Sequence, residues 1–372
     1  MVHCIKNGLV VSGKSVEARD VWIENGRFLP PQPKADTVTD ARGCYLLPGF
    51  VDIHTHGNAG VYFSDPVDFA SALADCAQKG ITTILPTLGA RPNEKTMEMM
   101  AHILQQQAAG HPGAAIGGIH LEGPFISHIK KGAMTPPELP CTLENFEALI
   151  AAGKGQVKVM TIAPERENAC RVIRRGVELG IRMSIGHTNA TFEEATAAIA
   201  AGATGATHTF NAMRSYGHRD PGVLGAVLTD PAITCEAICD MVHLAPATVR
   251  LIHACKGSEK MILVSDSGMF AGLGDGTYTY AGRTRYVRNG VSMLENGTIS
   301  SSCCTMYEDA KKLLELGFSL SDLAAVGSEN PAKAIGLFDT LGSIAPGKTA
   351  DFFLCDENLQ ISQVYVKGER YV

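Results

Sequence analysis

Residues 49–58 read GFVDIHTHGN, an apolar run that ends in two histidines with one residue between them. Side chains alternate between the two faces of a β-strand, so His54 and His56 would point the same way and Thr55 the other. A single pair of this kind is a modest indication of a metal site. Its meaning depends on what the rest of the chain places beside it.

Seven more apolar runs follow in the middle of the chain, with helical patterns between them. They are ITTILPT (81–87), IGGIHLEGP (116–124), VKVMTIAPE (157–165), RMSIGHT (182–188), GATHTFN (205–211), ITCEAICDMVH (233–243) and MILVSDS (261–267). The helix candidates include DFASALADCAQKG (68–80), EKTMEMMAHILQQQAAG (94–110), TFEEATAAIAAG (191–202), APATVRLIHACKG (245–257) and MYEDAKKLLELG (306–317). Strands that alternate with helices favour a parallel sheet, and eight of them close a (β/α)8 TIM barrel.

Both ends of the chain show a different pattern, in which short runs of alternating apolar and polar residues are separated by turn residues. CIKNGLVVSG (4–13) and DVWIENGRFL (20–29) each contain Asn-Gly, the strongest short hairpin signal. The last residues, from Gly342 onward, also alternate apolar and polar positions. We therefore expect an α/β protein with two domains: a small β-sandwich domain built from residues 1–48 plus 341–372, and a barrel domain of residues 49–340.

Composition excludes several classes of function. The 372 residues are 45% hydrophobic and 19% charged with a formal net charge of -6, and we find no basic stripe of the kind that binds nucleic acid. No run approaches the roughly 18 apolar residues of a membrane-spanning helix, and the first residues lack the apolar core of a signal peptide. The 11 cysteines are scattered without a CxxC pair. We predict a cytoplasmic protein without nucleic-acid or membrane partners.

Polar residues lie at the carboxyl ends of most of the apolar runs, where a barrel of this kind carries its active site. Besides the histidine pair, these residues are Glu122, His187, His208 and Asp266. Imidazole nitrogens and carboxylate oxygens suit Zn²⁺ or Fe²⁺, whereas neither Mg²⁺ nor Ca²⁺ favours histidine. A metal here would make hydroxide available near neutral pH, and Asp266 could take its proton and pass it to a leaving amine. This set of residues predicts metal-assisted hydrolysis of an amide or related bond.

These residues resemble the amidohydrolase superfamily in their types and order. The segments LPGFVDIHTHG, GIHLEGPF, KKGA, IGHTNAT, ATHTFNAM, HRDPGVLGAVL and NPAKAIGL resemble one branch of it, the amino-sugar phosphate deacetylases, over nearly the whole chain. The resemblance implies deacetylation of N-acetylglucosamine 6-phosphate to glucosamine 6-phosphate and acetate. It also implies a metal-bound hydroxide as nucleophile and Asp266 as general base and then acid.

The resemblance further implies a ligand set of one or two divalent metals per chain. Glu122, His187 and His208 would hold the first metal. His54 and His56 would hold a second with Glu122 shared, although some relatives lack this pair and use one metal. We expect Zn²⁺ or Fe²⁺, with Mn²⁺ or Co²⁺ as alternatives.

Phosphate recognition is implied in the same way. The backbone N–H groups of Asn211 and Ala212 match phosphate contacts of the family, and His243 matches a substrate-contacting histidine. Arg219 matches an arginine that reaches the phosphate in the neighbouring subunit, so a homodimer is expected.

Two positions depart from the pattern of the branch. Met134 stands where many relatives carry a histidine after KKGA, and Met241 where they carry a glycine. The substrate could therefore be the epimer, N-acetylgalactosamine 6-phosphate. Two further alternatives stay open, namely an amidohydrolase acting on another N-acyl or cyclic amide and a non-enzymatic scaffold with a structural metal. The pair Cys303-Cys304 has no functional interpretation.

Overall fold

Eight parallel strands form the central barrel among the residues that the computed structural model describes, which are 1–134, 137, 139–280, 282–288, 290–293 and 299–372. The strands are β8 (Phe50–Thr55), β11 (Ile81–Gly89), β13 (Ile119–Glu122), β14 (Val157–Ile162), β15 (Arg182–Ile185), β16 (Gly205–Ala206), β17 (Thr234–Ile238) and β18 (Met261–Val264). They pair in that order, and a short strand β12 (Ala115–Ile116) joins the edge of β11. Each of the eight corresponds to one of the predicted runs, which confirms the predicted barrel.

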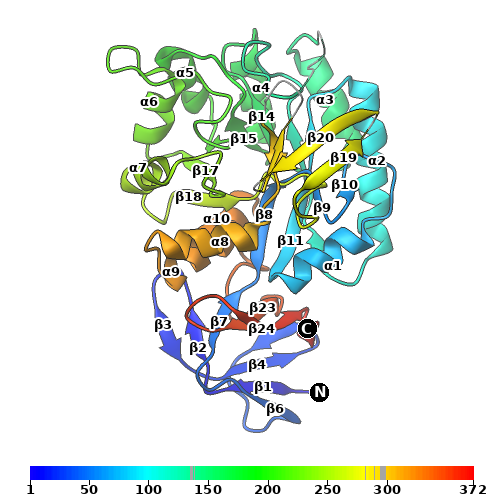
Figure 1. The fold of residues 1–372 in the computed structure, drawn as a ribbon, viewed down its shortest axis with the longest axis vertical. Helices are drawn as coiled ribbons and strands as arrows, with labels where there is room; N and C mark the ends of the chain where they lie inside the picture. The colour runs from blue at the N-terminus through cyan, green and yellow to red at the C-terminus, as the bar shows by residue number, and fades with distance from the viewer. Residues whose placement is uncertain (135–136, 138, 281, 289, 294–298) are drawn as a thin grey trace.

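Helices follow the strands along the chain and surround the barrel (Figure 1). They are α1 (Ala70–Gln78), α2 (Asn93–Ala109), α3 (Leu143–Ala152), α4 (Ala169–Glu178), α5 (Phe192–Ala200), α6 (Gly222–Thr229), α7 (Pro246–Lys256) and α8 (Met306–Glu315), then α9 (Leu320–Ala324), the π-helix η1 (Ala325–Glu329) and α10 (Asn330–Ala334). Local sequence sets their ends. The hydroxyl of Thr191 accepts from the Glu194 N–H while the Glu194 carboxylate accepts from the Thr191 N–H, a capping box that starts α5.

The seam between the last and first strands closes without a regular ladder. The N–H of Asp266 donates to the carbonyl of His54 at 2.9 Å. Deeper in the barrel, the Ser265 hydroxyl donates to the buried carboxylate of Asp52 at 2.5 Å. Burial raises the pKa of Asp52 to about 6, although its hydrogen bonds act in the opposite direction. One backbone and one side-chain hydrogen bond therefore complete the barrel at the place where His54 lies.

The two ends of the chain meet in a pair of sheets below the barrel (Figure 1). One sheet has the order β5-β4-β1-β6, with β1 (His3–Lys6), β4 (Val21–Glu24), β5 (Arg27–Leu29) and β6 (Thr37–Asp40). The other has the order β25-β24-β23-β7-β2-β3, with β2 (Leu9–Val11), β3 (Val16–Ala18), β7 (Tyr45–Pro48), β23 (Phe352–Cys355), β24 (Ile361–Val366) and β25 (Glu369–Arg370). Side chains of both sheets enclose one core, as expected for a β-sandwich. The exact domain boundaries, 1–48 plus 341–372 and 49–340, stay a prediction.

Alternation along β23 joins the two layers. Phe352 and Leu354 lie in the core of the sandwich, whereas Phe353 and Cys355 lie in the large core that includes the barrel. The ring of Phe353 meets that of Phe50 edge-on, with centroids 5.1 Å apart. A single strand thus fills both cores with its two faces, as the period of two in a strand allows.

The two Asn-Gly pairs behave differently. Asn25 and Gly26 have φ values of 49° and 75° and connect β4 to β5 in the expected hairpin. The hairpin expected at Asn7-Gly8 is wrong, because β1 and β2 pair with other strands in two different sheets. The turn at Asn7 leads the chain from one sheet of the sandwich to the other.

A further sheet, β19-β20-β21-β22, has no counterpart among the predicted elements. Its strands are β19 (Gly276–Tyr280), β20 (Arg283–Arg288), β21 (Val291–Met293) and β22 (Ile299–Ser302). This sheet lies between β18 and α8 in sequence. The ring centroid of Tyr280 in β19 lies 5.5 Å from that of Tyr62 in β10 (Val61–Tyr62). Strand β10 pairs with β9 (Gly57–Asn58). No helix in the described part of the chain is both long and apolar enough to cross a membrane.

Phe353→Ala should destabilise the whole fold, since it removes a fully buried ring that connects the sandwich strand to the barrel core. We expect a loss of about 3–5 kcal/mol in the free energy of unfolding, measured by urea denaturation. Phe192→Ala, which truncates a ring that is 36% exposed, is the matched control and should change little. Equal losses in both variants would contradict this account of the shared core.

Candidate active site

Six polar side chains converge at the carboxyl ends of the barrel strands. His54 and Glu122 lie within β8 and β13, and the others follow directly after β8, β15, β16 and β18. All six side chains are at least 85% buried. They form two donor groups, Glu122/His187/His208 and His54/His56/Asp266, each with one ligand atom per residue within 4.8 Å of the others. The residues that the strand ends predicted as ligands therefore lie together.

The Glu122 carboxylate lies at the centre of the first group. Its Oε1 lies 2.9 Å from Nε2 of His187 and 3.0 Å from Nε2 of His208. The two imidazole nitrogens are themselves 3.0 Å apart. Donors that each bind one ion at about 2.1 Å lie roughly 3 Å from one another, so this spacing suits a shared cation.

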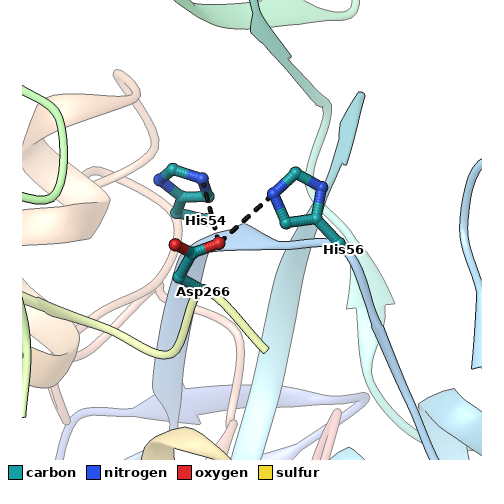
Figure 2. A group of neighbouring side chains, drawn as sticks. All are labelled: His54, His56 and Asp266. Atoms are coloured by element: carbon teal, nitrogen blue, oxygen red, sulfur yellow. Dashed lines mark ion pairs between the residues drawn. The ribbon is translucent and has the colours of Figure 1, made fainter. Parts of the chain in front are cut away.

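The second group contacts the same glutamate. Nε2 of His56 lies 3.2 Å from Oε2 of Glu122 and 3.2 Å from Oδ1 of Asp266. Nε2 of His54 lies 3.5 Å from an oxygen of each of the same two carboxylates and is buried without a hydrogen-bond partner among the described residues. Figure 2 shows both imidazoles directed at Asp266. The donor set of imidazole nitrogens and carboxylate oxygens fits a divalent transition metal.

Electrostatics in the cluster favour a cation. Burial opposes ionisation, but the neighbouring imidazoles hold the pKa of Glu122 well below its usual range. His54 lowers the pKa of Asp266 in the same way. Conversely, burial would lower the pKa of His54, yet Asp266, Glu122 and Glu236 raise it to about 10. The ionised carboxylates thus create a negative potential at the site. Protonated imidazoles balance this charge here, and a bound metal ion would balance it in their place.

His120, on the same strand as Glu122, has a different character. Burial and the charge of His54 lower the pKa of His120 to about 3, so its ring is neutral. Its two nitrogens bond with the carbonyl of Ile53 and the hydroxyl of Thr161. The ring therefore supports the cluster from below and has no nitrogen left for a metal.

The backbone is strained where the site residues lie. His187, His208 and Asp266 have φ values of 46°, 29° and 46°, in a region that side chains rarely adopt. Ala212 and Met241, in the loops beside them, have φ values of 50° and 60°. Such strain persists where the surrounding structure holds it, and it clusters at functional sites. The sequence carried no signal for this feature.

The predicted phosphate contacts lie in the loop after β16. Asn211 and Ala212 are partly buried and follow His208 by three and four residues. The Asn211 N–H donates to the His208 carbonyl at 2.9 Å, but its side-chain Nδ2 is buried with no partner in the part of the chain that the structure describes. The Ala212 N–H makes no hydrogen bond to a described residue. Arg219 lies exposed further along the loop.

His243 and Met134 border the site from other loops. Nδ1 of His243 lies 2.6 Å from the buried carboxylate of Asp240. The thioether of Met134 accepts from the Ala90 N–H at 3.1 Å and lies against Gly89, which pairs with Glu122 in the sheet. An apolar side chain therefore lies close to the ligand glutamate, whereas a charged pair lies at His243.

Two residues of the site were not predicted. Glu236 was included in the run ITCEAICDMVH without being singled out, and its carboxylate lies 3.1 Å from Nδ1 of His54. Its signal was a charge inside an otherwise apolar buried strand. Asp52 carried the same signal within the first run. The pair Cys303-Cys304 stays without a role, since burial raises the pKa of both thiols, to about 12 and about 11.

Comparisons with known proteins agree with this geometry. A model of the amidohydrolase family matches residues 45–371. An N-acetylgalactosamine-6-phosphate deacetylase from Escherichia coli is 34% identical over 99% of this chain and 99% of its own length. An N-acetylglucosamine-6-phosphate deacetylase from Bos taurus is 34% identical over 98% of this chain and 94% of its own length. A mutant N-acetyl-D-glucosamine-6-phosphate deacetylase from Mycobacterium smegmatis, solved with N-acetyl-D-glucosamine-6-phosphate, has a TM-score of 0.90 at 33% identity, covering 100% of this chain and 99% of that one.

Asp240→Asn should lower the pKa of His243. Burial alone lowers this pKa, but the hydrogen bond and charge of Asp240 raise it above 6.5. The pair therefore stabilises the fold fully below pH 6.5, and this contribution is lost as the pH rises through the raised value. An NMR titration of the His243 ring measures the shift. His3, whose pKa burial lowers at the far end of the chain, should titrate identically in both proteins, and an unchanged His243 would contradict the pairing.

Proposed function

Because this chain belongs to the amidohydrolase family, we propose that it is a metal-dependent deacetylase that converts N-acetylglucosamine 6-phosphate to glucosamine 6-phosphate and acetate. The observation that carries this proposal is the pair of donor groups at the carboxyl ends of the barrel strands, because the second group also contacts Glu122 of the first. Full-length relatives named as deacetylases of amino-sugar phosphates support the choice of substrate.

Five residues would hold one or two metal ions. Glu122, His187 and His208 would hold the first ion, and His54 and His56 would hold the second with Glu122 shared. A bound divalent metal supplies polarisation of the acetyl carbonyl and activation of water near neutral pH. Asp266, kept ionised by its neighbours, accepts the proton of the attacking water. It then delivers that proton to the sugar nitrogen as the C–N bond breaks, so acetate and the free amine leave. Zn²⁺ or Fe²⁺ fits this donor set, with Mn²⁺ or Co²⁺ as alternatives.

Substrate recognition falls to the loops. Nδ2 of Asn211 and the N–H of Ala212, neither of which bonds to a described residue, offer donors in the loop that follows His208. Protonated His243 and a forked guanidinium at Arg219 suit a phosphate. Because Arg219 is exposed on its own chain and therefore accessible to a second subunit, we propose that it serves the site of that subunit in a cytoplasmic homodimer.

The epimer N-acetylgalactosamine 6-phosphate is a second candidate substrate. It is favoured by the Escherichia coli relative of that name, which is as similar as the Bos taurus enzyme. Met134 also places a thioether beside Glu122, where it cannot donate a hydrogen bond to a sugar hydroxyl. A direct comparison of the two substrates decides between them.

The metal-loaded protein should release acetate from N-acetylglucosamine 6-phosphate, and a chelator should abolish the release. Asp266→Asn should lower kcat by about 10²- to 10⁴-fold, since it removes a positioned proton acceptor. Asp309→Asn is the matched control, because burial raises the pKa of the Asp309 carboxyl well above its usual range, so this variant removes no charge. The wild type failing to release acetate from either epimer would contradict the proposed function.

Arg219→Ala should raise KM for the phosphorylated substrate by about 10- to 100-fold, the magnitude of a lost charged hydrogen bond. Deacetylation of unphosphorylated N-acetylglucosamine should not change, so the comparison isolates the phosphate. Arg250→Ala, on the exposed face of α7, provides the control. A loss shared by both substrates would show that Arg219 acts on the fold and not on the phosphate.

A further inference from the structure

A fully buried carboxylate lies beneath the two donor groups and takes no part in the proposed reaction. Glu236 lies in the middle of β17, between the apolar positions of that strand. Its Oε2 is 3.1 Å from Nδ1 of His54 and 3.3 Å from the backbone nitrogen of His208. Its Oε1 has no hydrogen-bond partner among the described residues. One carboxylate therefore contacts one ligand from each donor group.

This contact decides which nitrogen of His54 is free to bind a metal. An ionised carboxylate only accepts hydrogen bonds, so Nδ1 of His54 carries the proton. The lone pair of the neutral ring then lies at Nε2, the atom that faces the carboxylates of Glu122 and Asp266. Without Glu236, the proton could move to Nε2 and block the ligand position.

The other ligand histidines lack such a partner. Nδ1 of His56 bonds with the carbonyl of Thr87 at 3.1 Å, and Nδ1 of His187 with the carbonyl of Lys130 at 2.8 Å. Nδ1 of His208 has no partner among the described residues. Among the described residues, His54 is the only one of these ligands whose Nδ1 contacts a carboxylate. A charged acceptor makes an imidazole a stronger donor to metal than a neutral carbonyl does.

We propose that Glu236 is the positioning residue that sets the affinity of the second metal, the one held by His54 and His56. It does so by fixing the tautomer and orientation of His54. The inference rests on the proposed metal-dependent hydrolase. Removal of Glu236 should convert a chain that binds two metals into one that binds a single metal at Glu122, His187 and His208.

The test is competitive titration of the metal-free full-length protein with Co²⁺ against a chromophoric chelator, with bound metal counted by elemental analysis. Wild type should bind two ions per chain. Glu236→Gln keeps the shape and an acceptor oxygen but loses the charge, and should weaken the second site about 10-fold; Glu236→Ala should weaken it about 100-fold. Asp240→Asn breaks another buried carboxylate–histidine pair outside the cluster and should leave both sites unchanged.

Three results would overturn the proposal. The first is a second site that keeps its affinity in Glu236→Ala. The second is a wild type that binds only one ion under metal-replete conditions. The third is an equal weakening of both sites together with a lower Tm of the metal-free protein. An acetate assay of the wild type runs in parallel. Activity with an unchanged second site would refute the role of Glu236 alone, whereas two bound metals without activity would refute the deacetylase function alone.

Discussion

The carboxylate of Glu122 is the constraint on which the site depends. One side chain from β13 lies within 3.5 Å of imidazole nitrogens that come from three other parts of the barrel. A buried carboxylate is costly unless it is paired, and here three of the rings contact the Glu122 oxygens at 2.9 to 3.2 Å, while Nε2 of His54 lies 3.5 Å away. The barrel must therefore hold the ends of β8, β13, β15 and β16 at fixed distances from one another. The positive φ values after β15 and β16 show that this arrangement carries backbone strain.

Closure of the barrel also helps to hold the site residues in place. His54 lies at the seam where β18 meets β8, and no regular ladder joins these strands. The carboxylate of Asp52 takes the place of that ladder through the Ser265 hydroxyl, while the N–H of Asp266 bonds directly to the His54 carbonyl. Asp266, the proposed general base, and His54, a proposed ligand, are thus coupled through one backbone hydrogen bond.

Much of the fold could be predicted from the sequence because its signals are local. Each barrel strand is a short apolar run, and each ligand interrupts such a run at its carboxyl end, where barrel geometry brings the ends together. Asn7-Gly8 was misleading because the same dipeptide also turns a chain between two sheets. The role of Glu236 depends on its contact with His54 in a strand that is distant in sequence, and β19 to β22 form a sheet whose pairing no local pattern specifies.

Chemistry and specificity come from different parts of the molecule. The proposed metal ligands lie in or just after the barrel strands, whereas Asn211, Arg219, His243 and Met134 lie in loops. Loops accept substitutions that strands do not, so the sugar preference can change while the ligand set stays intact. Met134 beside Glu122 illustrates this separation, because an apolar side chain has entered the wall of the site without displacing any ligand. The residues proposed for hydrolysis therefore depend on the barrel, whereas the residues proposed for sugar recognition depend on its loops.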